Sequence, residues 1–437
     1  MKLFLAITTS VLIGLAVDAR ADQPPSDVAK PVPVTRTEMK AALEALKSRA
    51  PRLPLPEAEG GGGVNNGRMR AAYLPESWIG PGGRAGAGRA GSGRFGQDST
   101  LDFAFTTSLF WVVSRGNNCH YCLGHQELKL RRAGLDEDTI ASLDSDWSVF
   151  DPRQQGALTY ARKLTLEPQR VGDADLAALR ALFTDAEVIE LTFSIARFNA
   201  TNRWTDGLGL PQDVRFGEEE SRLDTPTSER FQHTVSFATP MARRPRRSLP
   251  TLKEVEQAIE AARARAARVE LPGAEAAAAG LAAAIGKRMP LGWERAMAQV
   301  SGTGPSQVGA LNTIMTDENL PARLKAELAL ISAAHNRAWY AVGHAAHRLR
   351  GLGASTSDMA ALFDGDARAG DGASAAHALA AKLTADPHLI TDADIAELRE
   401  DFSDAETAQI VHVICMANLF DRFTESLGLP LEAGICE

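Results

Sequence analysis

Residues 173–187 read DADLAALRALFTDAE and residues 392–406 read DADIAELREDFSDAE, so two segments 219 positions apart are identical at 10 of 15 positions. Both segments place large apolar residues at i, i+3 and i+7, the spacing of one face of an α-helix. These residues are Leu176, Leu179 and Phe183 in the first segment and Ile395, Leu398 and Phe402 in the second. Each segment ends in an N-cap signal for a following helix, Thr184-Asp185 or Ser403-Asp404. The pattern predicts a helical unit that occurs twice.

The correspondence extends along most of the chain. A shift of 219 also relates Leu208-Gly209-Leu210-Pro211 to Leu427-Gly428-Leu429-Pro430, and a shift of 216 relates Thr35–Glu59 to Thr251–Glu275. No segment shows a convincing period-2 alternation. We therefore predict an all-α protein of two tandem helical-bundle repeats, with repeat one at 22–212, a polar linker at 213–250 and repeat two at 251–437. Residues 57–98 are rich in glycine and are expected to form a flexible insert in repeat one.

The first 21 residues have the features of a cleaved secretory signal. Lys2 is followed by the apolar stretch Leu3–Val17 and by Ala19-Arg20-Ala21, an A-x-A cleavage pattern. The apolar stretch is too short for a comfortable membrane span, and no later segment is apolar enough for one. The sequence predicts a mature chain that begins at about Asp22, lies in the periplasm or is secreted, and has no membrane span.

Charge and cysteine content exclude two classes of protein. The formal net charge is −8, which argues against general nucleic-acid binding. Four cysteines in 437 residues are too few for a disulfide scaffold. Cys415 lies in an apolar helical pattern and is expected to be buried and inert, whereas Cys436 is expected to be exposed in the C-terminal tail.

Cys119-His120-Tyr121-Cys122, followed by Leu123-Gly124-His125, is the chemically most informative stretch. The preceding Asn117-Asn118 pair is a good N-cap, and a helix that begins there would put both thiols at its positive end. Such a position lowers the pKa of a thiol. Two neighbouring thiols with an imidazole nearby predict thiol redox chemistry.

Residues 111–126 (WVVSRGNNCHYCLGHQ), together with the ARKLT segment from Ala161 and the N-R-x-x-D-x-L-G-L-P segment that ends at Pro211, resemble the alkyl hydroperoxidase D-like, or carboxymuconolactone decarboxylase, family. The resemblance implies an all-helical fold with the cysteines at the start of a central helix. It also implies that Cys122 attacks a hydroperoxide, that Cys119 resolves the sulfenic acid as a disulfide, and that His125 relays protons. The implied partners are a hydroperoxide substrate and an external dithiol reductant, with no cofactor and a possible homo-oligomer.

The chain departs from the family pattern in its acid. The position of the relay Glu, eleven residues before the first cysteine, holds Ser108, and Glu127 and Asp102 are the possible substitutes. Repeat two has Ala338, Ala341 and His344 opposite the two cysteines and His125, and Glu327 opposite Ser108. Repeat two is expected to be a structural partner for repeat one. The sharper alternative is that Glu327 or His344 completes a composite site with Cys122.

Other functions stay open at this stage. A thiol–disulfide oxidoreductase is a close relative of a peroxidase, and a non-catalytic helical scaffold or binding protein of the same fold is the non-enzyme alternative. Lactone decarboxylation fits poorly, because decarboxylating members of the family generally lack the two cysteines. Cys119, Cys122 and His125 could also hold zinc, but their spacing is cramped and no fourth ligand is evident. A further set recurs in both repeats and is expected to be a hydrogen-bonded packing cluster: Asn199, Asn202, Arg203 and Asp206, with Asn418, Asp421, Arg422 and Glu425.

Overall fold

The computed structural model describes residues 31–55, 65–79, 100–212, 226–239, 249–300, 302–364 and 373–435. Within these ranges the chain is helical, with no β-strand beyond one isolated bridge between Thr35 and Val235. The predicted all-α class is confirmed. The predicted signal sequence 1–21, most of the insert and of the linker, and Cys436 lie outside the described residues.

The first half of the chain, up to residue 239, carries the helices α1 to α10. Their bounds are α1 Arg36–Ala45, α2 Asn66–Tyr73, α3 Glu76–Ile79, α4 Phe103–Gly116, α5 His120–Arg132, α6 Glu137–Ser145, α7 Pro152–Leu166, α8 Asp173–Arg180, α9 Asp185–Gly207 and α10 Glu229–Gln232. Short 3-10 turns follow α1, α6 and α7, at η1 Leu46–Ser48, η3 Trp147–Val149 and η4 Pro168–Arg170.

The second half, from residue 249, carries α11 to α20. Their bounds are α11 Leu252–Ala264, α12 Ala274–Ile285, α13 Gly292–Met297, α14 Gly304–Thr316, α15 Ala322–Asn336, α16 Trp339–Gly351, α17 Thr356–Asp364, α18 Ala373–Ala385, α19 Asp392–Asp401 and α20 Asp404–Ser426, with the 3-10 turn η5 Pro387–Leu389. The sequence shift of 219 carries the starts of α4, α5, α6, α8 and α9 onto the starts of α15, α16, α17, α19 and α20. The element boundaries therefore follow the same shift as the sequence, and duplication stays our interpretation of it.

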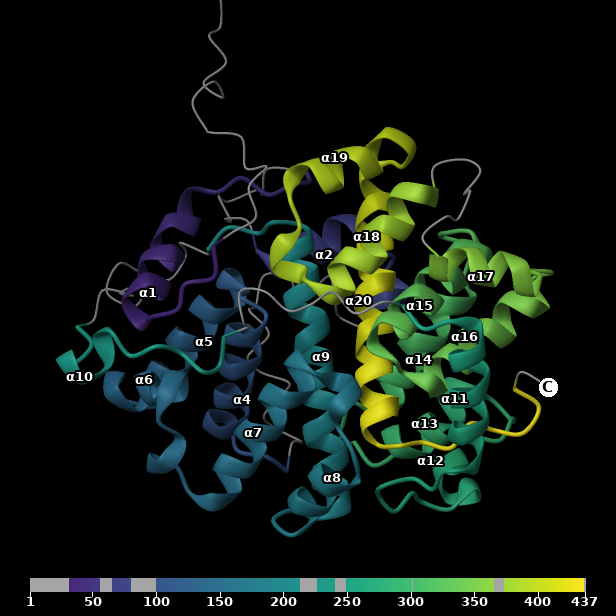
Figure 1. Ribbon diagram of the computed structural model, residues 1–437, viewed down its shortest axis with the longest axis horizontal. Coiled ribbons are helices and arrows are strands. Elements are labelled where there is room, and N and C mark those ends of the chain that lie inside the picture. Colours follow the sequence, from purple (N-terminus) through teal and green to yellow (C-terminus); the bar gives the residue numbers. More distant parts are fainter. Residues whose placement is uncertain are drawn as a thin grey trace, which may run out of the picture.

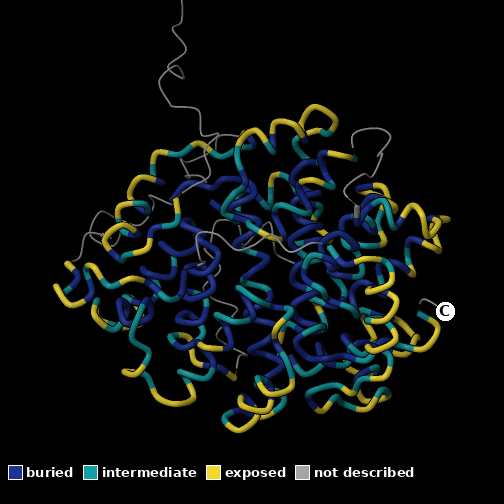
Figure 2. Tube along the Cα trace, viewed as in Figure 1, coloured by how far each residue is buried: buried dark blue, intermediate teal, exposed yellow. Residues whose placement is uncertain are grey.

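Helices α9 and α20 form the centre of the molecule. Figure 1 shows them running side by side, with most of the first half on one flank and most of the second half on the other. The ring of Phe193 packs against Phe423 with centroids 5.8 Å apart, and Trp204 packs against His412 with centroids 5.6 Å apart. The early part of each helix thus meets the late part of the other, which makes the pair antiparallel. Buried residues concentrate along this axis, and exposed ones lie at the periphery (Figure 2).

Two arginines join the halves reciprocally. Arg52 donates to Asp392 Oδ1 at 2.7 Å and to the carbonyl of Gly207 at the end of α9. Arg268, which the sequence shift of 216 places opposite Arg52, donates to Asp173 Oδ1 at 2.6 Å and to the carbonyl of Ser426 at the end of α20. Each half therefore anchors the other through the same kind of contact, the pattern of a self-complementary two-fold interface.

The structure corrects the expected boundaries of repeat one. Residues 65–79, placed by sequence in a flexible insert, form α2 and α3, and the side chains of Met69 and Trp78 are buried in the core. Residues 226–239, placed in the linker, pack on the first half, where Phe231 is buried and Thr37 donates to the carbonyl of Gln232. Apolar side chains override the glycine-rich and polar composition of their surroundings.

No helix in the described ranges combines the length and the apolar character that crossing a membrane requires.

Candidate thiol site

The cysteine pair begins α5, but the helix starts later than its sequence suggests. Asn117 closes α4 as its C-cap, and Asn118 adopts a left-handed conformation with φ of 54°. Cys119 is the N-cap of α5, with no side-chain capping bond. The expectation that Asn117-Asn118 caps α5 is therefore wrong, because asparagine also tolerates the left-handed turn that a tight connection between two helices needs.

A buried amide network fixes this turn against α9. Asn117 Nδ2 donates to Asn199 Oδ1 at 3.0 Å and to Asn202 Oδ1 at 2.9 Å. Asn199 Nδ2 in turn donates to Thr165 Oγ1 on α7 at 3.0 Å. The prediction of a hydrogen-bonded packing cluster is confirmed, and its consequence is that the start of α5 is tied firmly to α9.

Both thiols converge on one hydroxyl. The sulfur of Cys119 lies 3.1 Å from Thr205 Oγ1, and the sulfur of Cys122 lies 3.3 Å from the same atom. The Thr205 hydroxyl can donate to the carbonyl of Asn202 at 3.1 Å, so it is able to accept from a thiol. Cys119 and Cys122 are both free thiols, with exposed fractions of 0% and 3%. The structure thus brings the two predicted sulfurs together at the α5–α9 contact.

The two sulfurs have different electrostatic surroundings. Burial raises the pKa of Cys119 well above its ordinary value, and the hydrogen bond that its thiol donates to Cys122 and the negative charge of Asp206 raise it further. The hydrogen bond to Thr205 acts in the opposite direction on this pKa. The expectation that the helix N-terminus lowers the pKa of both thiols is therefore wrong for Cys119, because desolvation outweighs the helix dipole there.

Cys122 faces cations that the sequence did not reveal. Burial lowers the pKa of Arg70 on α2 and of Lys129 on α5, and in both cases electrostatic interaction with Cys122 opposes the shift. Among the described residues, neither cation forms an ion pair with a carboxylate. Lys129 lies seven residues after Cys122, which places both on one face of α5. Both cations therefore interact electrostatically with one of the two sulfurs, Cys122.

Arg70 is held in place by aromatic and polar contacts. Its guanidinium lies over the ring of Trp204, 5.2 Å from the centroid, and its Nε donates to Asn66 Oδ1 at 3.0 Å. The backbone N–H of Asn66 donates to the Tyr121 hydroxyl at 2.9 Å. Helix α2 is thereby tied directly to the cysteine-bearing turn of α5.

A hydrogen bond to the backbone fixes which ring nitrogen of His125 carries the proton. Its Nδ1 lies 2.8 Å from the carbonyl of Tyr121, and a carbonyl only accepts, so Nδ1 carries the proton. In the neutral imidazole the other nitrogen, Nε2, is then the acceptor. The ring packs on Tyr121 with centroids 4.4 Å apart, one turn after Cys122 on α5.

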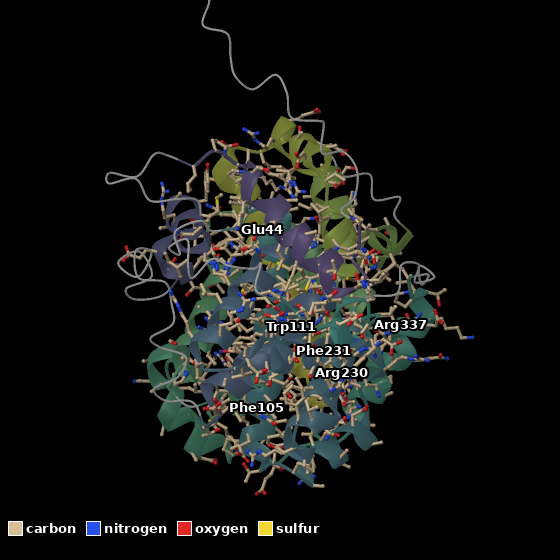
Figure 3. The ribbon with its side chains drawn as sticks, turned by 90° about the vertical axis from the view of Figure 1, so that its left-hand side faces the viewer. Glu44, Phe105, Trp111, Arg230, Phe231 and Arg337 are labelled. Carbon is tan, nitrogen blue, oxygen red and sulfur yellow. The ribbon has the colours of Figure 1, made fainter. Side chains whose placement is uncertain are left out.

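Glu127, the first expected substitute for the relay acid, is committed to packing. It is fully buried and accepts from Arg36 at 3.0 Å and from Trp111 Nε1 at 2.6 Å. The Arg36 guanidinium outweighs burial and lowers the pKa of this carboxyl. Figure 3, which looks onto the first half, labels Trp111 between Glu44 and Phe105. Glu127 thus holds α1 and α4 on α5 and is not available as a relay.

The other two candidate positions do not supply an acid either. Asp102 is the exposed N-cap of α4, where its side chain accepts from the backbone N–H of Phe105. Ser108 Oγ donates to the carbonyl of Ala104 in its own helix at 2.9 Å. The structure therefore brings neither expected substitute acid to the thiols.

The equivalent turn in the second half has lost its sulfurs. Ala338 is the N-cap of α16, and His344 Nε2 lies 2.9 Å from Glu432 Oε2. Glu327 is paired with His377 at 3.0 Å and with Arg323 at 2.8 Å. These partners of His344 and Glu327 all belong to the second half. The hydrogen bonds of these two residues therefore do not involve Cys122, and they give the alternative of a composite site no support.

Cys415 behaves as predicted for a core cysteine. It is 1% exposed in α20, and burial raises its pKa to about 12. Within the described ranges, no group of three or more His, Cys, Asp or Glu side chains is placed to hold a metal ion.

Arg70, Lys129 and Thr205 are the site residues that sequence reasoning missed. Thr205 lies in the N-R-x-x-D segment that carries part of the family resemblance. That resemblance drew attention to the segment, but nothing in the sequence indicated a role for the Thr205 hydroxyl. Lys129 follows Cys122 at helical spacing, a signal that was present and not used. Arg70 lies in a segment interpreted as insert and carried no signal.

Comparison with known proteins adds little. No family model matches the chain. A 110-residue segment is 34% identical to the uncharacterized protein MT2376 of Mycobacterium tuberculosis strain CDC 1551 / Oshkosh and to the uncharacterized protein Rv2313c of a second strain of that species. The segment covers 24% of this chain and 38% of each relative, so the chain spans less than two fifths of the relatives' length. These names state no activity.

Proposed function

We propose that the protein is an exported thiol peroxidase of the alkyl hydroperoxidase D-like type, with one active thiol site in a duplicated helical chain. The observation that carries the proposal is the convergence of the Cys119 and Cys122 sulfurs on the Thr205 hydroxyl, with Arg70 and Lys129 facing Cys122. Peroxide cleavage needs a thiolate nucleophile and a second thiol within disulfide reach, and this arrangement suits both requirements.

The first step assigns Cys122 as the nucleophile. Its thiolate attacks the terminal oxygen of the hydroperoxide, the O–O bond breaks, and the alcohol leaves with one proton. The sulfur becomes a sulfenic acid, so the two electrons of the reduction come from Cys122. His125, with its proton on Nδ1, is the proton carrier one turn away on α5.

The second step assigns Cys119 as the resolving thiol. Its sulfur attacks the Cys122 sulfur, water leaves, and a disulfide forms. The raised pKa of Cys119 fits this order, because the thiol that stays protonated does not compete for the peroxide. An external dithiol then reduces the disulfide and restores both thiols.

We assign to Arg70 and Lys129 the role of stabilising the negative charge that the reaction places on the Cys122 sulfur. Burial alone disfavours a thiolate, and a nearby positive charge without its own carboxylate partner offsets that cost. Within the part of the chain that the structure describes, Arg70 and Lys129 are both positively charged residues of this kind, with no carboxylate partner. The same burial favours a small hydroperoxide over a protein disulfide as the oxidant, because exposed fractions of 0% and 3% leave little sulfur surface for a macromolecule.

Two single substitutions test the proposal. In Cys122→Ser, addition of tert-butyl hydroperoxide should leave the remaining thiol of the site, Cys119, reduced. In Cys119→Ser, one equivalent should leave a sulfenic acid on Cys122 that dimedone traps, seen as a mass increase on that peptide. Cys415→Ser is the matched control and should behave as wild type. Thiols in the wild-type protein that stay reduced in excess peroxide would support the scaffold alternative instead.

A further inference from the structure

Two buried aromatic side chains near the thiols have ring nitrogens without the partners that such groups need. His412 is 2% exposed, and among the described residues neither of its ring nitrogens has a hydrogen-bond partner. Trp204 is fully buried, and its Nε1 likewise has none within the part of the chain that the structure describes. Buried donors without partners are rare in native proteins and call for a ligand or an ordered water.

These groups lie together with a buried cation. His412 lies between Trp78, at 5.7 Å between centroids, and Trp204, at 5.6 Å. The Arg70 guanidinium lies over the same Trp204 ring and, among the described residues, is balanced by no carboxylate. Arg70 also interacts electrostatically with His412 and with the sulfurs of Cys415 and Cys122. Trp204 thus contacts both the Arg70 guanidinium and the His412 ring, and Arg70 links this cluster electrostatically to Cys122.

The chemistry of this cluster matches an anion. A guanidinium and N–H donors form their strongest hydrogen bonds with carboxylate or phosphate oxygens, and a buried cation without a counter-ion is costly. A hydrocarbon ligand would leave all three groups unsatisfied. The aromatic rings of Trp78 and Trp204 supply apolar contact for the body of an organic molecule.

We propose that Arg70, Trp204 and His412 bind the carboxylate of an anionic organic hydroperoxide and present its peroxide group to Cys122. The inference rests on the proposed function for its substrate, and it adds a substrate class and a recognition site that spans both halves of the chain. Repeat two would then contribute to the reaction through His412 of α20, and not through His344 or Glu327.

The experiment uses a matched pair of peroxides and an inert carboxylate. The pair is cumene hydroperoxide and its para-carboxylate, which differ by one charged group, and the readout is the rate of thiol loss at pH 7. The inert probe is 4-isopropylbenzoate, whose binding is followed through the intrinsic fluorescence of Trp204 and Trp78. The variants are Arg70→Met and His412→Phe, with Arg68→Met on the same helix as the control.

The expected result is that the para-carboxylate reacts about tenfold faster than the neutral peroxide with wild type and Arg68→Met. The ratio should fall to about one in Arg70→Met and in His412→Phe. His412→Phe is a mild change, because the first half has a phenylalanine, Phe193, at the equivalent position of α9. 4-Isopropylbenzoate should quench the fluorescence saturably in wild type and not in these two variants.

The outcomes separate the two proposals. A ratio of one or less in wild type, with both peroxides still consuming thiols, overturns the anionic substrate and leaves the peroxidase intact. Saturable binding of 4-isopropylbenzoate that survives His412→Phe overturns the assigned residues. Thiols inert to both peroxides reject the peroxidase, and the fluorescence titration then decides by itself whether an anion site exists.

Discussion

The Thr205 hydroxyl is the single group that the two sulfurs share, so it should control the reaction between them. Its hydrogen bond lowers the pKa of Cys119 against the larger effect of burial. A net hydrogen bond contributes about 1 kcal/mol, which is roughly a fivefold change in a rate or equilibrium.

Thr205→Val keeps the shape of the side chain and removes this hydrogen bond. We expect disulfide formation after one equivalent of peroxide to become about fivefold slower at pH 7. Because burial keeps the pKa of Cys119 high, the rate should rise with increasing pH in both proteins. Quenched-flow alkylation followed by mass spectrometry measures it. Thr205→Ser retains the hydroxyl and should react as wild type; equal rates in Thr205→Val would contradict the assigned role.

At this scale the sequence predicted the sulfurs and not their environment. The C-x-x-C spacing and His125 could be read directly, because they lie within two turns of one helix. Arg70 interacts electrostatically with Cys122 because tertiary structure ties α2 to α5 through Asn66 and Tyr121, and no local pattern encodes that arrangement. The high pKa of Cys119 follows from the depth of burial, which depends on helices distant in the sequence such as α9, the helix that carries Thr205.

At the scale of elements, the turn between two antiparallel helices is built in the same way in both halves. Asn336 Nδ2 donates to Asn418 Oδ1 at 3.1 Å and to Asp421 Oδ2 at 2.8 Å, as Asn117 does to Asn199 and Asn202. The chemical difference between these two sets is a carboxyl at position 421. Burial raises the pKa of Asp421 to about 8 from an ordinary value of 3.8.

This difference predicts a pH dependence of stability. Between pH 4 and pH 8 the folded chain holds a proton on Asp421 that the unfolded chain releases. The contribution of this bound proton to the free energy of unfolding is therefore complete below about pH 4 and is lost as the pH rises toward 8. The loss is on the order of a few kcal/mol. Asp421→Asn introduces the residue of the first half, and we expect it to flatten the dependence of the unfolding free energy between pH 5 and pH 8.

Urea unfolding at several pH values measures the effect. Asn202→Asp, the reverse exchange in the first half, is the matched control and should steepen the decline. An unchanged slope in Asp421→Asn would show that this carboxyl is ionised in the fold.

Helix periodicity and N-cap signals predicted the elements well, since α9 and α20 begin directly after their predicted caps, Thr184 and Ser403. Prediction failed where tertiary contact overrides composition. The Asn117-Asn118 pair forms the turn between α4 and α5 and does not cap α5. Residues 65–79 contain helices because the side chains of Met69 and Trp78 are buried in the core.

At the scale of the whole molecule, the two halves behave as the two subunits of a symmetric pair within one chain. Arg52 and Arg268 exchange equivalent bonds, and the Phe193–Phe423 and Trp204–His412 contacts exchange positions along α9 and α20. The second half has Ala338 and Ala341 at the positions that correspond to the two cysteines, and it keeps the packing surface. One thiol pair per chain is therefore the central chemical claim.

A count of thiols tests that claim most directly. The chain contains four cysteines, and one equivalent of tert-butyl hydroperoxide should remove two thiols per chain, with a Cys119–Cys122 disulfide found by non-reducing peptide mapping. Cys415 should remain reduced, because burial holds its pKa at about 12. Four thiols that survive excess peroxide, or a disulfide between any other pair, would contradict the account.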